Sequence, residues 1–192
     1  MGKLYDKTGA VVVTVASDHT DSITDAVTTI EYEHNEIHAG ESYEYTEVRD
    51  QTIDHVWDIQ ITTPNTTKWA HFTFEFDSEK ETDWYFYENP VIVLAGTAVT
   101  PLNHNRNSTN TTGLVIKTIT NTTTGNANAD TTVAAATLLM HGISGDGKKA
   151  GGQGGSRHEW ILDQNQDYVL RFIATAAGYV NYHLDWYEHT SK

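Results

Sequence analysis

Residues 55–62 read HVWDIQIT, and their apolar and polar side chains alternate. Alternation with a period of two is typical of a β-strand that is buried on one side only. The apolar residues share one face of this strand: Trp57, Ile59 and Ile61. Asp58 and Gln60 fall on the opposite face, where we expect them to meet solvent. The stretch therefore predicts a half-buried strand.

The same pattern recurs along the chain. Residues 69–77 place Phe72, Phe74 and Phe76 on one face. Residues 167–175 and 179–189 predict a hairpin around Ala177–Gly178. Residues 131–140 are more apolar and predict a more buried strand. The further strand candidates are residues 28–34, 113–120, 131–140, 167–175 and 179–189. The inward residues of the last candidate are Val180, Tyr182, Leu184 and Trp186.

The composition favours the same fold class. The 10 Tyr and 5 Trp, with abundant Thr, suit pleated sheets better than helices, and no convincing amphipathic helix is found. A chain of 192 residues is long enough for one sizeable domain. We therefore predict an all-β fold, a β-sandwich of jelly-roll type over residues 27–192.

An N-terminal arm is predicted to precede this domain over residues 1–26. It contains the apolar stretch AVVVTVAS at residues 10–17, followed by a polar stretch without periodicity. One interpretation is an extended arm whose strand adds to a sheet edge on a neighbouring protein. The alternative interpretation is a frayed terminus.

Charge and cysteine content exclude several functions. The net charge of −14 disfavours binding to nucleic acid or to an anionic membrane surface. Because the chain has no cysteine, it forms no disulfide, thiolate metal site or cysteine nucleophile. No stretch is apolar enough to span a membrane, and the first residues do not resemble a secretory signal. We therefore expect a protein that is made and assembled in the cytoplasm.

The stretch HGISGDGKK at residues 141–149 contains the G-x-x-x-x-G-K core of a phosphate-binding loop, from Gly142 to Lys148. A working loop needs a Ser or Thr after the lysine, for Mg²⁺, and a helix behind it. Here Lys149 follows, and residues 150–155 are rich in glycine, which disfavours a helix. The motif therefore predicts a strand connection that binds neither ATP nor GTP.

Two further motifs imitate metal sites. His34 and His38 are four residues apart, but on the strand expected here they would lie about 13 Å apart, too far to share one ion. DQNQD at residues 163–167 begins like a calcium loop, but Tyr168 replaces the required glycine, so we interpret it as a turn. Scattered histidines leave open a site assembled in space, although hydrogen bonding on a sheet face is the favoured interpretation: His19, His55, His71 and His183.

Carboxylates and aromatic residues admit a functional and a structural interpretation. The carboxylates alternate outward along strands, as solvated residues do: Glu31, Glu33, Glu36, Glu41 and Glu44. The sequence singles out no catalytic, cofactor-binding or metal-binding residue. Aromatic residues beside carboxylates are typical of sugar-binding modules, but also of the core and of subunit interfaces, which we favour. These residues are Tyr43, Tyr45, Trp84, Tyr85 and Tyr87. Core candidates elsewhere are Trp160, Trp186, Tyr187 and the row that starts at Phe72.

Three ordered segments carry a resemblance to a known family. They are TTIEYEHNEIHAGESY at residues 28–43, WDIQITTPNTTKWAHFTFEF at residues 57–76 and YVNYHLDWYEHTSK at residues 179–192. In these segments the chain resembles a family of small proteins of tailed bacteriophages, encoded near the major capsid protein. The resemblance covers most of residues 28–192 and implies a virion structural protein of the head decoration (cement) kind. The family supplies no catalytic or ligand-binding residues.

The resemblance leads to a functional expectation. We expect a non-enzymatic decoration protein, without cofactor, that binds the major capsid protein on the outside of the head. Proteins in that role are often β-rich trimers, and the many Tyr and Trp residues favour a homotrimer. Two alternatives stay open: a carbohydrate-binding module of a head or tail fibre, and a cupin-like enzyme that binds a metal through its histidines.

Overall fold

The computed structural model of the chain describes residues 2–5, 11–15, 32–121, 131–132, 135–145, 152–153 and 159–190. The chain divides into two units, Met1–Asn35 and Glu36–Lys192. In the first unit β1 (Gly2–Tyr5) pairs with β2 (Val11–Val15) as an antiparallel hairpin. The strand predicted in residues 10–17 is thus present, with a partner that the sequence pattern missed. The boundary predicted after residue 26 lies outside the described residues.

Helix α1 (Tyr32–Ala39) corrects the strand predicted over residues 28–34, of which residues 28–31 are not described. Gly40 ends the helix in the left-handed region, at φ 74°. Its N–H donates to the carbonyl of Ile37, and the N–H of Glu41 donates to that of Glu36. This pair of bonds is a Schellman motif, which needs a glycine after the last helical residue. The short alternation in residues 28–34 predicted a strand, whereas Gly40 is the residue that lets a helix end here.

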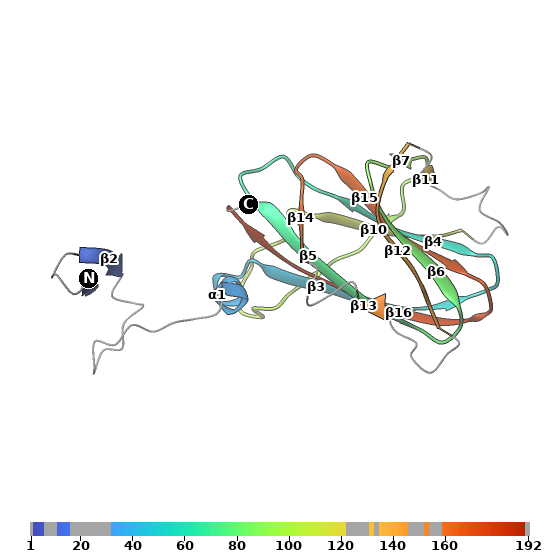
Figure 1. Cartoon of the computed structure of the whole chain (residues 1–192), viewed down its shortest axis with the longest axis horizontal. Coiled ribbons are helices and arrows are strands. Elements are labelled where there is room, and N and C mark those ends of the chain that lie inside the picture. The colour runs from blue at the N-terminus through green and yellow to red at the C-terminus, as the bar shows by residue number, and fades with distance from the viewer. Residues whose placement is uncertain are drawn as a thin grey trace. The chain divides into compact units, whose positions relative to one another are not determined.

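The second unit contains two antiparallel sheets, which form the layers of a β-sandwich (Figure 1). Sheet I has the order β12 (Thr137–Ser144), β6 (Thr82–Glu88), β15 (Asp167–Ala174), β4 (Val56–Thr62), β10 (Val115–Asn121) and β8 (Thr97–Ala98). Sheet II has the order β13 (Gly152–Gln153), β5 (Trp69–Ser78), β16 (Gly178–His189), β3 (Ser42–Gln51) and β9 (Leu102–Asn103), and β14 (Trp160–Leu162) also pairs with β5. A separate pair joins β7 (Val91–Ile92) to β11 (Thr131–Thr132). The predicted all-β sandwich is confirmed.

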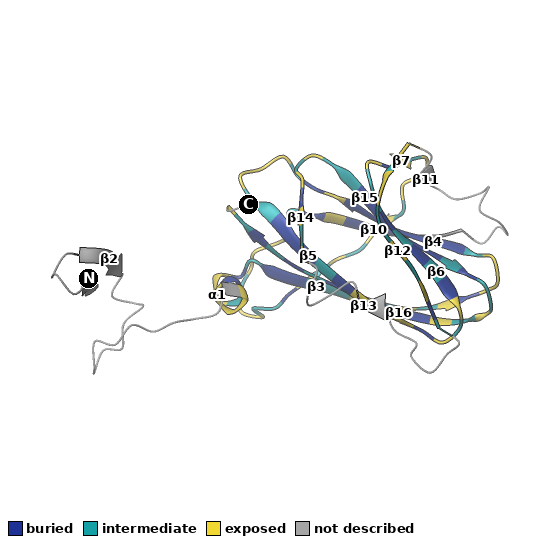
Figure 2. Cartoon of the chain, viewed as in Figure 1, coloured by how far each residue is buried: buried dark blue, intermediate teal, exposed yellow. Residues whose placement is uncertain are grey.

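Buried residues lie along the strands of both sheets (Figure 2). The core that they form is mainly aromatic. The ring of Trp57 from sheet I lies 4.7 Å from that of Tyr182 in sheet II. Phe74 of sheet II lies 5.4 Å from Phe86 of sheet I. The inward residues predicted for β4, β5 and β16 are all buried, so period-two alternation identified these faces correctly.

Strands β15 and β16 do not form the predicted hairpin. Each pairs with strands of its own sheet, β15 with β4 and β6, and β16 with β3 and β5. The turn around Ala177 therefore carries the chain from one sheet to the other. Alternation tells which residues of a strand face the core, but it carries no information on which strand lies beside it.

Strand β12 is more exposed than predicted for residues 131–140. The segment is divided between β11 and β12, and β12 lies at the edge of sheet I. Leu138 is 51% exposed, while Leu139 and Met140 pack against the core from its margin. The run of apolar residues in this segment led to a prediction of burial on both faces of the strand, which is wrong.

No helix among the described residues is long and apolar enough to cross a membrane.

Candidate functional site

Polar side chains gather on the outer face of sheet II, on three neighbouring strands. Register places Glu44 of β3 opposite Asp185 of β16. It also places His183 of β16 between Thr46 of β3 and Glu75 of β5. All five side chains alternate with buried ones, so they share the face that points away from the core. We call these residues, together with His104, the histidine–carboxylate face.

Glu44 is the centre of this face. Its Oε2 atom lies 3.2 Å from Nε2 of His183 and 3.5 Å from Nε2 of His104. The Nδ1 atom of His104 is 2.9 Å from Oγ of Ser42. The tautomer of His104 decides whether its Nδ1 atom accepts a hydrogen bond from the Ser42 hydroxyl or donates one to it. One carboxylate thus orients two imidazole rings.

Asp185 lies beside this group, and burial raises the pKa of its carboxyl group above the ordinary value. His104 and His183 act in the opposite direction, while Glu44 and Glu75 raise the pKa further. Loss of hydration is the largest of these effects, because it disfavours the charged form. The face therefore holds one carboxyl group that binds its proton more tightly than a solvated aspartate does.

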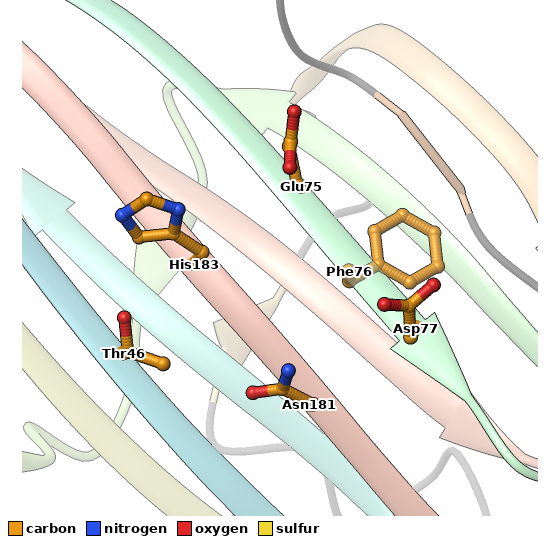
Figure 3. Close-up of a pocket in the computed structure, with 6 residues that line it drawn as sticks. All are labelled: Thr46, Glu75, Phe76, Asp77, Asn181 and His183. Atoms are coloured by element: carbon orange, nitrogen blue, oxygen red, sulfur yellow. The ribbon is translucent and has the colours of Figure 1, made fainter.

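A hollow of about 260 Å³ opens next to His183. Figure 3 shows the residues that line it: Thr46, Glu75, Phe76, Asp77, Asn181 and His183. Two of them are carboxylates, and three more carry groups that form hydrogen bonds. The hollow suits hydrogen-bond donors and cationic groups better than anions.

Ser42, His104 and Glu44 follow the order hydroxyl, imidazole, carboxylate that hydrolases use for nucleophilic attack. Ser42 is only 5% exposed, however. Its residue pairs with Tyr187 of β16, and its carbonyl accepts the N–H of His104. A nucleophile must reach its substrate, and a hydroxyl enclosed between strands does not. The geometry supports a structural role for this trio.

The histidine candidates that the structure describes do not come together. His71 binds Oε1 of Glu159 through Nδ1 at 2.7 Å, in a group apart from His183. His55 belongs to the turn before β4, and His19 lies outside the described residues. Among the residues that the structure describes, no three His, Asp or Glu side chains are arranged to hold a metal ion. Hydrogen bonding on a sheet face, the favoured interpretation, holds for His71 and His183.

His34 and His38 lie on helix α1, which corrects the extended chain assumed for them. Residues four apart on a helix share a face, so the predicted separation of about 13 Å was wrong. Glu36, between them, was expected in solvent but is buried, and its Oε1 atom lies 3.9 Å from Nε2 of His189. The helix thus directs one carboxylate toward the end of β16.

Tyr187 also belongs to the outer face of sheet II and not to the core as predicted. Its ring stacks on that of His71, with centroids 4.5 Å apart, and its hydroxyl donates to Oε2 of Glu159 at 3.1 Å. Position explains the error: on β16 the buried residues are even-numbered, from Val180 to Trp186. An aromatic residue at an odd position of this strand faces outward.

The aromatic residues considered for sugar binding are divided between core and surface. Tyr43 and Trp84 are buried in the core. On the outer face of sheet I the ring of Tyr85 is nearly parallel to those of Tyr87 and His141, at 5.8 and 4.5 Å between centroids. Sugar-binding rings offer an open face, whereas the ring of Tyr85 is stacked against two neighbours. The arrangement therefore gives the sugar-binding alternative little support.

Asp58 and Gln60 are buried on the outer face of sheet I, contrary to the prediction that they meet solvent. Asp58 accepts two hydrogen bonds from Arg171, at 2.7 and 2.8 Å. The side-chain amide of Gln60 donates to the carbonyl of Leu94 at 2.9 Å and accepts the N–H of Gly96 at 3.0 Å. Residues 94–96 thus cover part of this face, and a covering segment cannot be read from the alternation of the strand beneath it.

The remaining motifs are structural where they are described. Gly142, the first glycine of the phosphate-loop motif, lies in β12 opposite Trp84, and an added Cβ atom would meet the indole ring at 2.7 Å. Lys148 lies outside the described residues. Residues 163–166 form the predicted turn between β14 and β15, with Asn165 in the left-handed region at φ 54°. The carbonyl of Asp163 accepts the hydroxyl of Thr63 at 2.6 Å.

No protein-family model matches the chain, and neither the curated proteins nor the solved structures contain a significant match to it.

Proposed function

We propose that the chain is a non-enzymatic structural protein of a tailed-bacteriophage virion. In this role it decorates the outer surface of the head by binding the major capsid protein, and it acts as a homotrimer. The resemblance over residues 28–43, 57–76 and 179–192 motivates the proposal. Its localisation is then the capsid surface, after assembly in the host cytoplasm.

The observation that carries the proposal is the division of the chain into two units. The larger unit is a sandwich with a dense aromatic core, which suits a rigid body on a shell. The smaller unit contains a hairpin of only two strands, and such hairpins are marginally stable alone in water. A strand of this kind gains stability when it adds to the sheet of another protein.

The strand order supports the finer assignment to the jelly-roll type. Sheet II contains the order β3-β16-β5-β14, and sheet I contains β4-β15-β6-β12. Consecutive strands therefore alternate between the sheets, from β3 to β6 and again from β14 to β16. Eight strands shared between two packed sheets are typical of a jelly roll, and this order therefore supports the assignment.

The geometry of the histidine–carboxylate face favours a structural role over catalysis. Its groups satisfy one another around Glu44, and the hydroxyl of Ser42 is enclosed. The net charge of −14 does not prevent attachment, because a shell surface with basic or apolar patches complements it. A trimer attaches at three places, so each contact stays modest while the total affinity is high.

A sedimentation experiment tests the proposal. Purified full-length protein is mixed with expanded shells that lack it, and we expect it to sediment with them. A variant that lacks residues 1–26 is expected to fold, by circular dichroism, but to remain in the supernatant. Full-length protein that fails to bind such shells contradicts the decoration function. Binding of the shortened variant contradicts only the role of the arm.

A further inference from the structure

Within the described residues, strand β12 leaves a long edge of sheet I unpaired. It pairs with β6 on one side, and no strand of the described residues pairs with its other side. The opposite edge of sheet I ends in β8, and the edges of sheet II end in β13, β14 and β9, all of two or three residues. With eight residues, β12 is the longest strand at any of these edges. An edge strand without a partner offers its N–H and C=O groups as a template for another strand.

Apart from a shift of register between Leu138 and Met140, this edge lacks the features that usually prevent pairing with other chains. No charged residue occurs in Thr137–Ser144, and Leu138 and Ile143 are 51% and 64% exposed. Strand β3 is different where it extends beyond its short pairing with β9, because it carries charged residues there, including Glu47 and Arg49. Charges on an edge oppose association, and an apolar edge without them favours it. The sequence therefore protects one edge and leaves the other open.

Charge indicates which strand would fit there. The chain has 26 acidic and 12 basic residues, so most of its surfaces repel a second copy. Residues 1–15 are an exception, with Lys3 and Lys7 against a single acid, Asp6. They include β2, whose sequence VVVTV consists of β-branched residues that favour strands. This segment is the part of the chain best matched in charge and propensity to a neutral edge on an acidic body.

We propose that β2 of one copy pairs with the free edge of β12 in a second copy, and so extends sheet I by the N-terminal hairpin. The contact joins two different surfaces, so it is heterologous and closes into a ring when each copy donates to the next. The inference rests on the proposed homotrimer and specifies the surfaces that join its subunits. It does not require binding to a shell.

Cross-linking tests the pairing directly, because the natural chain has no cysteine. One tagged copy carries Val13→Cys, a second, differently tagged copy carries Met140→Cys, and the mixture is treated with a short bis-maleimide. We expect a covalent pair that contains both tags. The control pairs Val13→Cys with Val48→Cys, on the outer face of β3, and should give no such pair. Equal cross-linking of test and control, or none in the test mixture, overturns the inference.

Light scattering tests the same contact without labels. The double variant Leu138→Lys/Ile143→Lys places two charges on the edge, and we expect its mass to fall threefold, to the 21.4 kDa of one chain. Val48→Lys is the matched control, since Val48 is 61% exposed, and should remain trimeric. Thermal unfolding should be unchanged in both variants, because all three positions are exposed.

The two readouts separate this inference from the proposed function. A double variant that stays trimeric overturns the pairing at β12, and so does a wild-type protein that is monomeric at all concentrations. If the double variant unfolds, cross-linking of the otherwise natural chain decides. A trimer linked through β2 and β12 that fails to bind shells supports the inference and contradicts the decoration function.

Discussion

The polar residues on the outer faces of the two sheets differ in their exposure to solvent. On sheet II, Glu44 and His183 lie at the surface and bind each other. On sheet I, Asp58 is 1% exposed and accepts two hydrogen bonds from Arg171. Residues 94–96 cover part of the same outer face. Both faces arise from the same alternation of apolar and polar residues along a strand. What differs is the chain that covers them.

This difference has an energetic consequence. A charged group in solvent loses little when its partner is removed, since water replaces the partner. A buried charge has no such substitute, and an unpaired one is costly. The same kind of substitution should therefore be tolerated on sheet II and harmful on sheet I.

The largest effect is expected for Asp58→Ala. The change leaves the guanidinium of Arg171 buried without its carboxylate, which should lower the free energy of unfolding by about 3–5 kcal/mol. The matched control is Asp77→Ala, an exposed carboxylate on the outer face of sheet II, which should change it by less than about 0.5 kcal/mol. Urea unfolding of both variants measures the difference. Equal effects would mean that the covering of sheet I has no energetic importance.

A smaller effect is expected for Gln60→Ala, which removes both hydrogen bonds to residues 94–96. The carbonyl of Leu94 and the N–H of Gly96 lose their partner, at a cost of about 1–3 kcal/mol. Amide hydrogen exchange at Gly96 should become faster as the segment is released. Asn181→Ala, at the hollow of sheet II, is the control and should leave exchange at Gly96 unchanged. Unchanged exchange in Gln60→Ala would show that other contacts hold the segment.

The sequence predicted the fold class and the inward faces because both depend on local alternation. Phe72, Phe74 and Phe76 are buried as expected, and so are the inward residues of β4 and β16. The errors arise where distant chain decides the environment. Asp58 is buried partly through Arg171, 113 positions along the chain, and no local pattern contains that information. The sheet change between β15 and β16 escaped prediction for the same reason.

The candidate site was less predictable than the fold. Glu44 and His183 lie 139 positions apart and meet only because β3 pairs with β16 in a particular register. Glu44 was expected to point outward, and His183 to form hydrogen bonds on a sheet face, but nothing in the sequence joined them. His104 directly follows β9, and no motif in the sequence singled it out. Only knowledge that β3 pairs with β16 in this register would have brought Glu44 and His183 together.

The smallest effect is expected for Asp185, and it has the opposite sign. Burial raises the pKa of its carboxyl group in the folded chain above the ordinary value. The folded state therefore holds this proton more tightly than the unfolded state does. Below the ordinary pKa the protonated group favours folding, and this contribution is lost as the pH rises through the folded value. At neutral pH a partly desolvated charge remains, which opposes folding.

Asp185→Asn replaces that charge by a neutral group of the same shape. We expect the variant to be slightly more stable than the natural chain at pH 7, with the difference disappearing below the ordinary pKa of about 4. Thermal unfolding of both proteins between pH 3.5 and pH 7, in steps of about half a unit, measures the trend. Glu44→Gln serves as the control, because it removes a charge from the same face but keeps an oxygen acceptor for His104 and His183, and its effect on stability at pH 7 should be small. A natural chain that is the more stable at pH 7, by a margin that shrinks on acidification, would mean that the two histidines outweigh burial at Asp185. The outer face of sheet II would then stabilise the charged form of Asp185. The two outer faces would differ in how they stabilise charged groups by more than their burial predicts.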